Sequence, residues 1–366
     1  MRRCSYELTA LGFDSFFSGQ VNIEIESEYF PARIAAEHRG EYDVWSTRGE
    51  ERAKLSARLF RKLSGSRKGG MPGTGDWVAL NPDLDVDGLA IVEQVFERRT
   101  VFTRGAAGKE ARVQVVAANV DAVCLVSGLD DNYNVRRVER YLSRIWASGA
   151  QPVLILNKTD LCEDVPGVVS ELEKYCKNVP ILPISALKND GINAVRNIIG
   201  TGRTVALVGS SGTGKSTLVN ALLGEEKMGT GAVREKDSRG RHTTTRRQML
   251  ILPNGGLIVD TPGMRELQLF DDEGIDTVFA DIDELARQCR FSDCKHESEP
   301  GCAVQAALNR GDVTPERFYS YRKMGKEAAD FELRQMPCRH RKSEKPSGKI
   351  VKSDNKRPKK RRGQLK

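Results

Sequence analysis

The stretch Thr204–Leu223, TVALVGSSGTGKSTLVNALL, decides the fold class. Its middle part, Gly209–Ser216, matches the phosphate-loop pattern G-x-x-x-x-G-K-[ST]. A short apolar run precedes this phosphate loop and a helical pattern follows it, which is the strand, loop and helix order that the pattern needs. Glycines let the backbone approach phosphate groups, and N–H groups at a helix start can bind them. The stretch therefore predicts a nucleoside triphosphate site in an α/β domain.

Each part of the phosphate loop has an expected role. The backbone N–H groups are expected to cradle the phosphates, and the Lys215 side chain to reach the β- and γ-phosphates, which makes it a candidate catalytic residue. The Ser216 hydroxyl is expected to bind Mg²⁺. An accidental glycine-rich turn is the alternative, and the flanking patterns argue against it. The expected nucleotide contacts here are Gly209, Ser210, Ser211, Gly212, Thr213, Gly214, Lys215, Ser216 and Thr217.

Short apolar runs on both sides of this stretch predict the rest of a sheet. Buried strands of a covered parallel sheet have this continuous apolar character. Between the runs lie helical patterns, such as residues 134–148, where apolar residues recur at spacings of three and four. This alternation predicts a mostly parallel α/β sheet. The runs are Val120–Val126, Pro152–Leu156, Ile181–Ile184, Gln248–Leu252 and Leu257–Val259.

A second phosphate motif, DTPG, follows the last of these runs at residues 260–263. Asp260 is expected to hold the water shell of Mg²⁺, and the Gly263 amide to contact the γ-phosphate. D-x-x-G alone is often an ordinary turn. After a phosphate loop and a strand it becomes a specific signal.

The NKTD segment, residues 157–160, indicates which base is bound. The Asp160 carboxylate can accept two hydrogen bonds from guanine N1–H and the N2 amine, a donor pair that adenine lacks. The Lys158 stem is expected to lie along the purine, and Asn157 to brace the loop. Ser185–Ala186, after another apolar run, can offer a backbone N–H to guanine O6. A surface loop is the alternative. The expected base contacts are Asn157, Lys158, Thr159, Asp160, Ser185 and Ala186.

The order of these motifs is unusual. An ordinary GTPase places the phosphate loop first, but here NKTD begins 209 − 157 = 52 residues before it. This order predicts a circular permutation, which domains with nearby termini tolerate. The segment after DTPG then leads directly into the last predicted module, so its movement on loss of the γ-phosphate would be transmitted there.

Four metal ligands crowd together after residue 288. Cys289, Cys294, His296 and Cys302 supply three thiolates and one imidazole within fourteen residues. Soft ligands in a set of four suit tetrahedral Zn²⁺, and a full set leaves no open position, which indicates a structural site. Cysteines scattered by chance are the alternative. Helical patterns flank the cluster.

Residues 1 to about 115 lack long helical periodicity. Short β-like runs, Asp76–Leu80 and Leu89–Val95, surround glycine-rich loops such as Gly69–Gly75. These features predict a small all-β domain, a barrel if its edges close. Such a barrel can bind nucleic acid on one face, and the alternative is a barrel that docks onto another protein. The basic residues that favour RNA are Arg33, His38, Arg39, Arg48, Arg52, Arg58, Arg61, Lys62, Arg67 and Lys68.

Composition limits the remaining classes. Of the 366 residues 30% are charged and 39% hydrophobic, and no run approaches the ~18 unbroken apolar residues of a membrane span. The N-terminus MRRCSYELTA has no apolar stretch behind its arginines, so we expect no signal peptide and a cytoplasmic protein. Residues 339–366 hold 13 Lys/Arg and 2 Asp/Glu, which gives this segment a net charge of +11, whereas the net charge of the whole chain is +8. This tail is expected to be disordered, either solubilising or attracted to nucleic acid.

The motifs together resemble the circularly permuted GTPases of bacterial ribosome assembly, and within them the ribosome small subunit-dependent GTPase A family. The resemblance extends to about Arg334 and also includes RHTTT at Arg241–Thr245. It implies an OB-fold barrel, a permuted GTPase domain and a C-terminal helical zinc-binding domain. It further implies GTP hydrolysis stimulated by the small ribosomal subunit during its late maturation, with 16S rRNA as a partner.

We therefore expect a multidomain chain that is monomeric. The expected parts are an OB-fold-like, RNA-binding β-barrel (residues 1–115), a circularly permuted α/β P-loop GTPase domain (116–270), a helical zinc-binding domain (271–336) and a basic tail (337–366). One structural Zn²⁺ and a catalytic Mg²⁺ are expected with GTP.

The water-orienting residue is the least conventional part of the predicted site. Met264 stands where many GTPases have a glutamine after DxxG, and a thioether cannot orient or deprotonate water. His242 is the candidate replacement, although a lone histidine is often an ordinary surface residue. A threonine of Thr243–Thr245 should bind Mg²⁺ and the γ-phosphate; Thr244 represents the three, which the sequence does not distinguish.

A basic segment surrounds these residues, and it is either a solvated loop or an rRNA contact ordered only with GTP. The motifs allow three functions: a subunit-stimulated GTPase, a non-catalytic GTP-dependent RNA-binding switch, and a P-loop kinase or ATPase. NKTD followed by SA argues against the third. The basic residues of the segment around His242 are Arg234, Lys236, Arg239, Arg241, Arg246 and Arg247.

Overall fold

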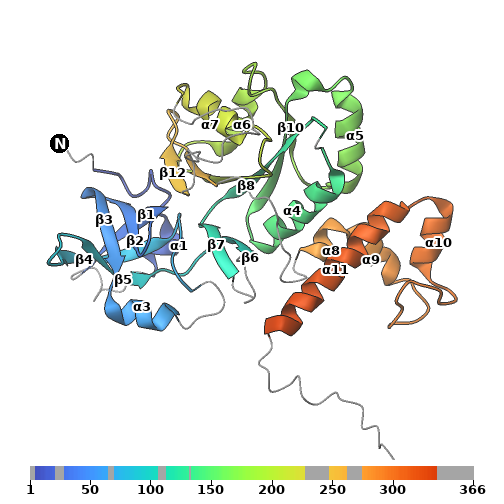
Figure 1. Ribbon diagram of the computed structural model, residues 1–366, viewed down its shortest axis with the longest axis horizontal. Helices are drawn as coiled ribbons and strands as arrows, with labels where there is room; N and C mark the ends of the chain where they lie inside the picture. The colour runs from blue at the N-terminus through green and yellow to red at the C-terminus, as the bar shows by residue number, and fades with distance from the viewer. Residues whose placement is uncertain are drawn as a thin grey trace, which may run out of the picture.

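The N-terminal region forms a closed five-stranded barrel (Figure 1). The computed structural model describes residues 5–20, 29–64, 70–105, 113–131, 133–226, 247–261 and 274–335. Strand β1 pairs with both β2 and β4, so the order β1-β2-β3-β5-β4 returns to β1, with β3 and β5 parallel. The predicted OB-like barrel is confirmed. Its elements are α1 Ser15–Ser18, β1 Phe30–Glu37, β2 Glu41–Ser46, β3 Gly49–Leu55, α3 Ala57–Ser64, β4 Trp77–Leu84 and β5 Ala90–Val95.

The central region is the predicted α/β sheet. Its strand order is β10-β9-β8-β11-β13-β12, and all neighbours are parallel except β12 and β13. A hairpin, β6–β7, leads into it from the barrel. The elements are β6 Val101–Gly105, β7 Val113–Ala118, β8 Ala122–Gly128, α4 Val135–Ala147, β9 Gln151–Asn157, η1 Thr159–Leu161, α5 Val165–Tyr175, β10 Ile181–Pro183, α6 Ile192–Ile199, β11 Thr204–Val208, α7 Lys215–Leu223, β12 Gln248–Ile251 and β13 Leu257–Asp260.

This strand order brings the sequence motifs to one side of the sheet. NKTD follows β9, the phosphate loop follows β11, and the aspartate of DTPG ends β13. The winding of the sheet reverses between β8 and β11, which lie side by side although β9 and β10 separate them in the chain. Ligands of open α/β sheets bind at the carboxyl ends of the strands beside such a reversal.

The sheet is buried on both faces because helices cover each side. Alternate residues of a strand point to opposite faces. Accordingly Val123 and Leu125 of β8 pack in one cluster with α4, whereas Cys124 and Val126 pack with α6 and α7. The apolar stripe predicted for residues 134–148 is the buried face of α4, formed by Val138, Leu142 and Ile145. The continuous apolar runs are explained by this two-sided cover.

The barrel joins the sheet at strand β12. A bridge between Ala36 of β1 and Gln248 of β12 makes the barrel and the sheet one hydrogen-bonded array. Arg33 of β1 lies at this junction and is 1% exposed, so the prediction that it contributes to an RNA-binding surface is wrong. Its guanidinium donates to the Asn119 carbonyl and to Thr204 Oγ1, both at 2.8 Å, and burial lowers its pKa to about 10.

Residues 274–335, called the helical module below, form the last part of the described chain. The predicted helices are present as α8 Ile275–Val278, α9 Ala280–Ala286, α10 Ala303–Arg310 and α11 Pro315–Gln335. The module packs on α4 through α8 and α11 (Figure 1). Within the described ranges, no helix has the length and apolar character needed to cross a bilayer.

Candidate nucleotide site and metal centre

The phosphate loop has a backbone that only glycine accommodates at two positions. Gly209 has φ +148°, and a Cβ there would lie 2.3 Å from the Val126 carbonyl oxygen of β8. Gly214 has φ +88° and caps the start of α7, and its Cβ would lie 2.3 Å from Asn157 Nδ2. These glycines let the loop curl tightly between β8 and the NKTD segment.

Lys215 points into the loop that it follows. Its Nζ donates to the carbonyls of Gly209 (2.9 Å) and Ser210 (2.7 Å). Burial lowers the pKa of Lys215 to about 8, although the nearby Asp260 carboxylate opposes this shift. Burial likewise raises the pKa of Asp260, against the pull of Lys215. A buried cation at the start of α7 and a buried acid at the end of β13 therefore influence each other, and a triphosphate with its metal ion would supply compensating charges there.

Asn157 joins three of the sequence motifs. Its Nδ2 donates to the Thr213 carbonyl of the phosphate loop at 2.9 Å. Its Oδ1 accepts the backbone N–H of Ala186 at 2.9 Å. One buried side chain therefore connects the NKTD segment, the phosphate loop and the SA turn, which lie far apart in the sequence.

The side chains expected to hold the base are oriented by neighbours. Ser185 Oγ donates to Asp160 Oδ1 at 2.5 Å, and this bond is the main reason that the pKa of Asp160 is lowered. Lys158 adopts φ +67°, and its Nζ lies 2.5 Å from Asp130 Oδ2. Sequence reasoning missed Asp130; its place just after the apolar run of β8, at the same side of the sheet as NKTD, was the available signal.

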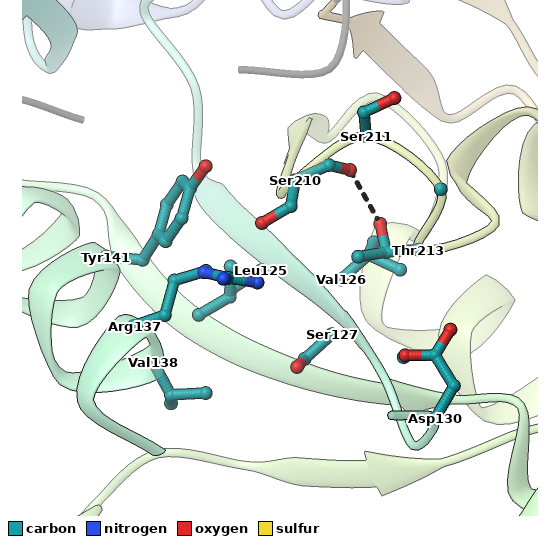
Figure 2. A pocket seen from close by; sticks show the side chains of 12 residues that line it. Leu125, Val126, Ser127, Asp130, Arg137, Val138, Tyr141, Ser210, Ser211 and Thr213 are labelled. Atoms are coloured by element: carbon teal, nitrogen blue, oxygen red, sulfur yellow. Dashed lines mark hydrogen bonds between the residues drawn. The ribbon is translucent and has the colours of Figure 1, made fainter. Parts of the chain in front are cut away.

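A cavity of about 230 Å³ lies between the phosphate loop and α4. Figure 2 shows Tyr141 and Arg137 of α4 directed toward the loop residues Ser210 and Thr213. Burial raises the pKa of the Tyr141 hydroxyl to about 12. Sequence reasoning assigned α4 only a packing role and missed these two residues. The cavity is lined by Leu125, Val126, Ser127, Gly128, Asp130, Arg137, Val138, Tyr141, Ser210, Ser211, Gly212 and Thr213.

Three expected site residues, His242, Thr244 and Gly263, lie outside the described residues. The other expected nucleotide contacts lie at one side of the sheet. The next residue after Asp260, Thr261, is buried and donates through Oγ1 to the Leu207 carbonyl at 2.6 Å. This bond ties the start of the DTPG turn to the strand that enters the phosphate loop.

The predicted metal ligands converge in the helical module. The ligand atoms of Cys289, Cys294, His296 and Cys302 all lie within 4.8 Å of one another. The sulfurs of Cys289 and Cys302 are 3.8 Å apart, and His296 Nδ1 is 3.5 and 3.4 Å from them. Two sulfurs bound at 2.3 Å in a tetrahedral zinc site are separated by about 3.8 Å. The donor set and its spacing therefore fit one tetrahedral ion.

Backbone geometry around the cluster explains how so short a segment converges. His296 adopts φ +59°, which turns the chain back between its neighbours. The Glu299 carboxylate accepts the backbone N–H groups of Lys295 (2.9 Å) and Glu297 (2.8 Å), and these bonds lower its pKa to about 2. Cys302 caps α10 by accepting the Gln305 N–H. The loop is thus held by an ionised carboxylate as well as by its ligands.

A phosphate loop after β11, with NKTD at the end of an earlier strand of the same sheet, defines a circularly permuted P-loop GTPase. The RsgA GTPase family model matches residues 95–270. The chain is 44% identical over 331 residues to the small ribosomal subunit biogenesis GTPase RsgA of Opitutus terrae, covering 88% of this chain and 90% of that one. It is 46% identical to the RsgA of Xanthomonas axonopodis pv. citri, covering 82% and 81%.

Solved structures agree with this assignment. The crystal structure of YjeQ from Thermotoga maritima is 28% identical, with a TM-score of 0.59, over 82% of this chain and 99% of that one. The structure of YloQ, described as a circularly permuted GTPase, is 22% identical with a TM-score of 0.56 and shows the shared fold. The chain belongs to the RsgA GTPase family. It is accordingly a hydrolase of GTP, which decides against the non-catalytic switch and the ATPase.

Proposed function

We propose that this GTPase acts in biogenesis of the small ribosomal subunit, in its late maturation, and that the subunit stimulates GTP hydrolysis. The observation that carries the nucleotide part is Asn157, whose bonds to Thr213 and Ala186 draw the phosphate and base motifs around one site. The subunit part is supported by the names of relatives that share 40–46% of their residues with this chain.

In this site different side chains recognise the base and the phosphates of GTP. Asp160, kept ionised by Ser185, accepts the two donors of guanine, and Lys158 lies along the base with its ammonium held by Asp130. Lys215 moves its proton-bearing nitrogen from the loop carbonyls to the β- and γ-phosphates. Ser216, Thr244 and Asp260 would hold Mg²⁺, which screens the phosphate charge when bound, and Gly263 would meet the γ-phosphate.

The metal of the helical module is proposed to be structural Zn²⁺. The four ligands of the cluster fill a tetrahedron and leave no position for a substrate. Thiolates and an imidazole favour zinc over oxygen-seeking ions such as Mg²⁺. The ion would hold together a loop that has little hydrophobic core of its own.

The partner is proposed to be 16S rRNA within the small subunit. Helix α3 on the barrel supports this, because its exposed face carries Arg58, Arg61 and Lys62. Cationic side chains position a protein on the RNA backbone without reading its sequence. The protein is proposed to act as a monomer in the cytoplasm, where ribosomal subunits are assembled.

GTP turnover with and without purified small subunits tests this function. We expect turnover to rise at least tenfold with subunits, and stimulation to fall as salt rises, because phosphate contacts release counterions. Large ribosomal subunits at the same concentration are the control. Equal turnover in all three conditions would refute the proposed role of the small subunit while leaving the GTPase assignment intact.

A further inference from the structure

The basic side chains on the strands of the barrel are paired with acids. Arg52 of β3 donates through Nε to Asp43 Oδ1 (2.7 Å) and through Nη1 to Glu41 Oε2 (2.9 Å), both on β2. Arg48, between these strands, bonds to Glu51 at 2.9 Å. These charges are therefore already compensated within the barrel. The remaining pairs on the strands and their turns are His38–Asp43, Lys54–Asp85 and Lys54–Asp87.

Strands β2 and β3 are the face on which an OB-fold usually binds nucleic acid. In this chain their sequences, EYDVWS and GEERAKL, hold two bases and four acids, a net charge of 2 − 4 = −2. A phosphate backbone would be repelled by this excess of acids, and both bases are occupied by acidic partners. The usual OB-fold face is therefore a poor match for RNA here.

Helix α3 carries the opposite charge. Its eight residues include Arg58, Arg61 and Lys62, all exposed, and no acid. In the part of the chain that the structure describes, none of these three cations has a carboxylate within ion-pair distance. Arg61 Nε donates to the Ala57 carbonyl at 3.2 Å, so this side chain runs back along the helix. Figure 1 shows α3 on the outside of the barrel, at its lower edge in this view, where a large partner can reach it.

Phe60 is a large apolar side chain that the packing of α3 does not use. The helix is attached to the barrel core by Leu59, which is 7% exposed, and by Leu63 four residues later. Phe60 lies outside this apolar stripe and is 51% exposed. Its neighbours one helical turn away on either side, Ala57 and Ser64, are small. The aromatic ring is therefore open to a partner.

We propose that α3 is the surface through which the barrel contacts RNA, with Phe60 stacked on an unpaired base. The cations of α3 bind the phosphates on either side of that base. A single exposed apolar side chain is common on proteins, but uncompensated cations around an aromatic ring match a polyanion whose bases can stack. The RNA segment is single-stranded or looped, because bases inside a duplex are stacked on one another. The proposal rests on the proposed function, since it assigns the rRNA contact of the barrel to one helix.

Binding of the full-length protein to purified small subunits at several KCl concentrations separates stacking from charge. Phe60→Ala is expected to weaken binding at least fivefold and to leave the slope of log affinity against log salt unchanged, because stacking releases no counterions. Arg61→Ala is expected to weaken binding and to reduce that slope by about one, the contribution of one phosphate contact.

Two substitutions elsewhere on the barrel are the matched controls. Val86→Ala shortens an exposed apolar side chain on the turn between β4 and β5, and Arg52→Ala removes a cation of the acidic strand face. Both should change the affinity for subunits less than twofold. The proposal would be overturned if Phe60→Ala bound subunits as tightly as Val86→Ala, or if Arg52→Ala lost as much affinity as Arg61→Ala.

A second arm uses short single-stranded oligo(A) in place of subunits. Phe60→Trp should bind it as tightly as the unmodified protein, and the fluorescence of the added indole should be quenched by the stacked base. Phe60→Ala should again lose at least fivefold in affinity. Weaker subunit binding by Phe60→Ala without quenching in Phe60→Trp would assign α3 to a ribosomal protein and overturn the RNA contact. An unmodified protein that does not bind subunits would refute the proposed function, and the oligo(A) arm would then decide for α3.

Discussion

At the scale of single residues, the proposed preference for guanine depends on Asp160. Its carboxylate can accept both guanine donors only while it is ionised, and the Ser185 hydroxyl bond lowers its pKa accordingly. In Asp160→Asn the amide would face the N2 amine donor to donor. We expect GTP affinity to fall about 100-fold and xanthosine triphosphate, which has an acceptor at that position, to bind better than GTP.

Equilibrium binding of the two nucleotides measures this exchange of specificity. Asp190→Asn, an exposed carboxylate on the neighbouring SA turn, is the matched control and should leave both affinities unchanged. Loss of affinity for both nucleotides would mean that Asp160 supports the loop rather than reads the base.

Lys215 predicts a pH dependence of nucleotide binding. Its pKa in the free protein is about 8, and the negative phosphates would raise it in the complex. Affinity should therefore be level below pH 8 and fall as pH rises above 8, by roughly tenfold per pH unit until the pKa of the complex is reached. Calorimetry in two buffers at pH 8 should detect uptake of about half a proton on binding. Lys215→Arg, which stays charged, should take up none.

Substitution of His242 is expected to affect GTP turnover without affecting GTP binding. With Met264 in the usual glutamine position, another group has to orient the attacking water. His242→Ala is expected to keep GTP affinity within twofold and to lose about 100-fold or more of subunit-stimulated kcat. Single-turnover kinetics with radiolabelled GTP gives both values. Full turnover in the variant would remove His242 from the mechanism.

The sequence indicated several of these residues because their chemistry is local. A phosphate loop and an N-K-x-D motif specify short backbone geometries, so Lys215 and Asp160 can be picked from spacing alone. The partners that orient Asp160 and Lys158 are distant in sequence: Ser185 follows Asp160 by 25 residues, and Asp130 precedes Lys158 by 28. Such pairs depend on which strands are neighbours, and no motif records that.

At the scale of secondary-structure elements, the start of helix α7 shows how a loop is fixed by what packs on it. Gly214 has φ +88°, and a Cβ there would meet Asn157 Nδ2. Gly214→Ala is expected to push Asn157 away from both of its partners and to weaken GTP binding at least tenfold, or about 1.4 kcal/mol or more. Fluorescence titration with a labelled guanine nucleotide measures this loss.

The other end of the same helix supplies the control. Gly224 has φ +74°, and a Cβ there would meet nothing within 4 Å. Gly224→Ala therefore carries the same kind of backbone cost, about 1–2 kcal/mol, without the collision. Both variants should melt at lower temperature, and only Gly214→Ala should lose affinity. Equal affinities would show that the Asn157 links do not matter for binding.

A helix or strand could be predicted from the sequence where packing imposes a periodic spacing of apolar residues. Contacts made by charged residues could not be predicted in this way. Helix α4 followed from apolar spacing, since its buried face includes Val138, Leu142 and Ile145. Its buried ion pair with α11 was invisible, because Glu139 and Arg317 are charged and would be placed on the surface by any hydrophobic pattern. The prediction for Arg33 was wrong for the same reason: a basic residue in a basic region is fully buried. Burial of paired charges is decided by tertiary partners that sequence spacing does not reveal.

At the scale of the whole molecule, the helical module should depend on its metal ion. Binding of zinc to small modules contributes ~10–16 kcal/mol at neutral pH, comparable to the entire stability of a domain. Chelation, or Cys302→Ser, is therefore expected to unfold residues 274–335 while the sheet still binds GDP. Circular dichroism with metal analysis checks this. Cys162→Ser, away from the cluster, is the control, and retained helix content after complete metal loss would contradict the prediction.

The attachment of the barrel at β12 also limits edge-to-edge pairing between copies of the protein. An outermost strand with free N–H and C=O groups is a template for pairing with other chains, and aggregation follows. On one flank that template is shielded, because β1 bridges to β12. On the other flank β10 has three residues, one of them Pro183, which has no amide hydrogen. The two outer strands of the α/β sheet, β10 and β12, are therefore poor templates for pairing with another chain.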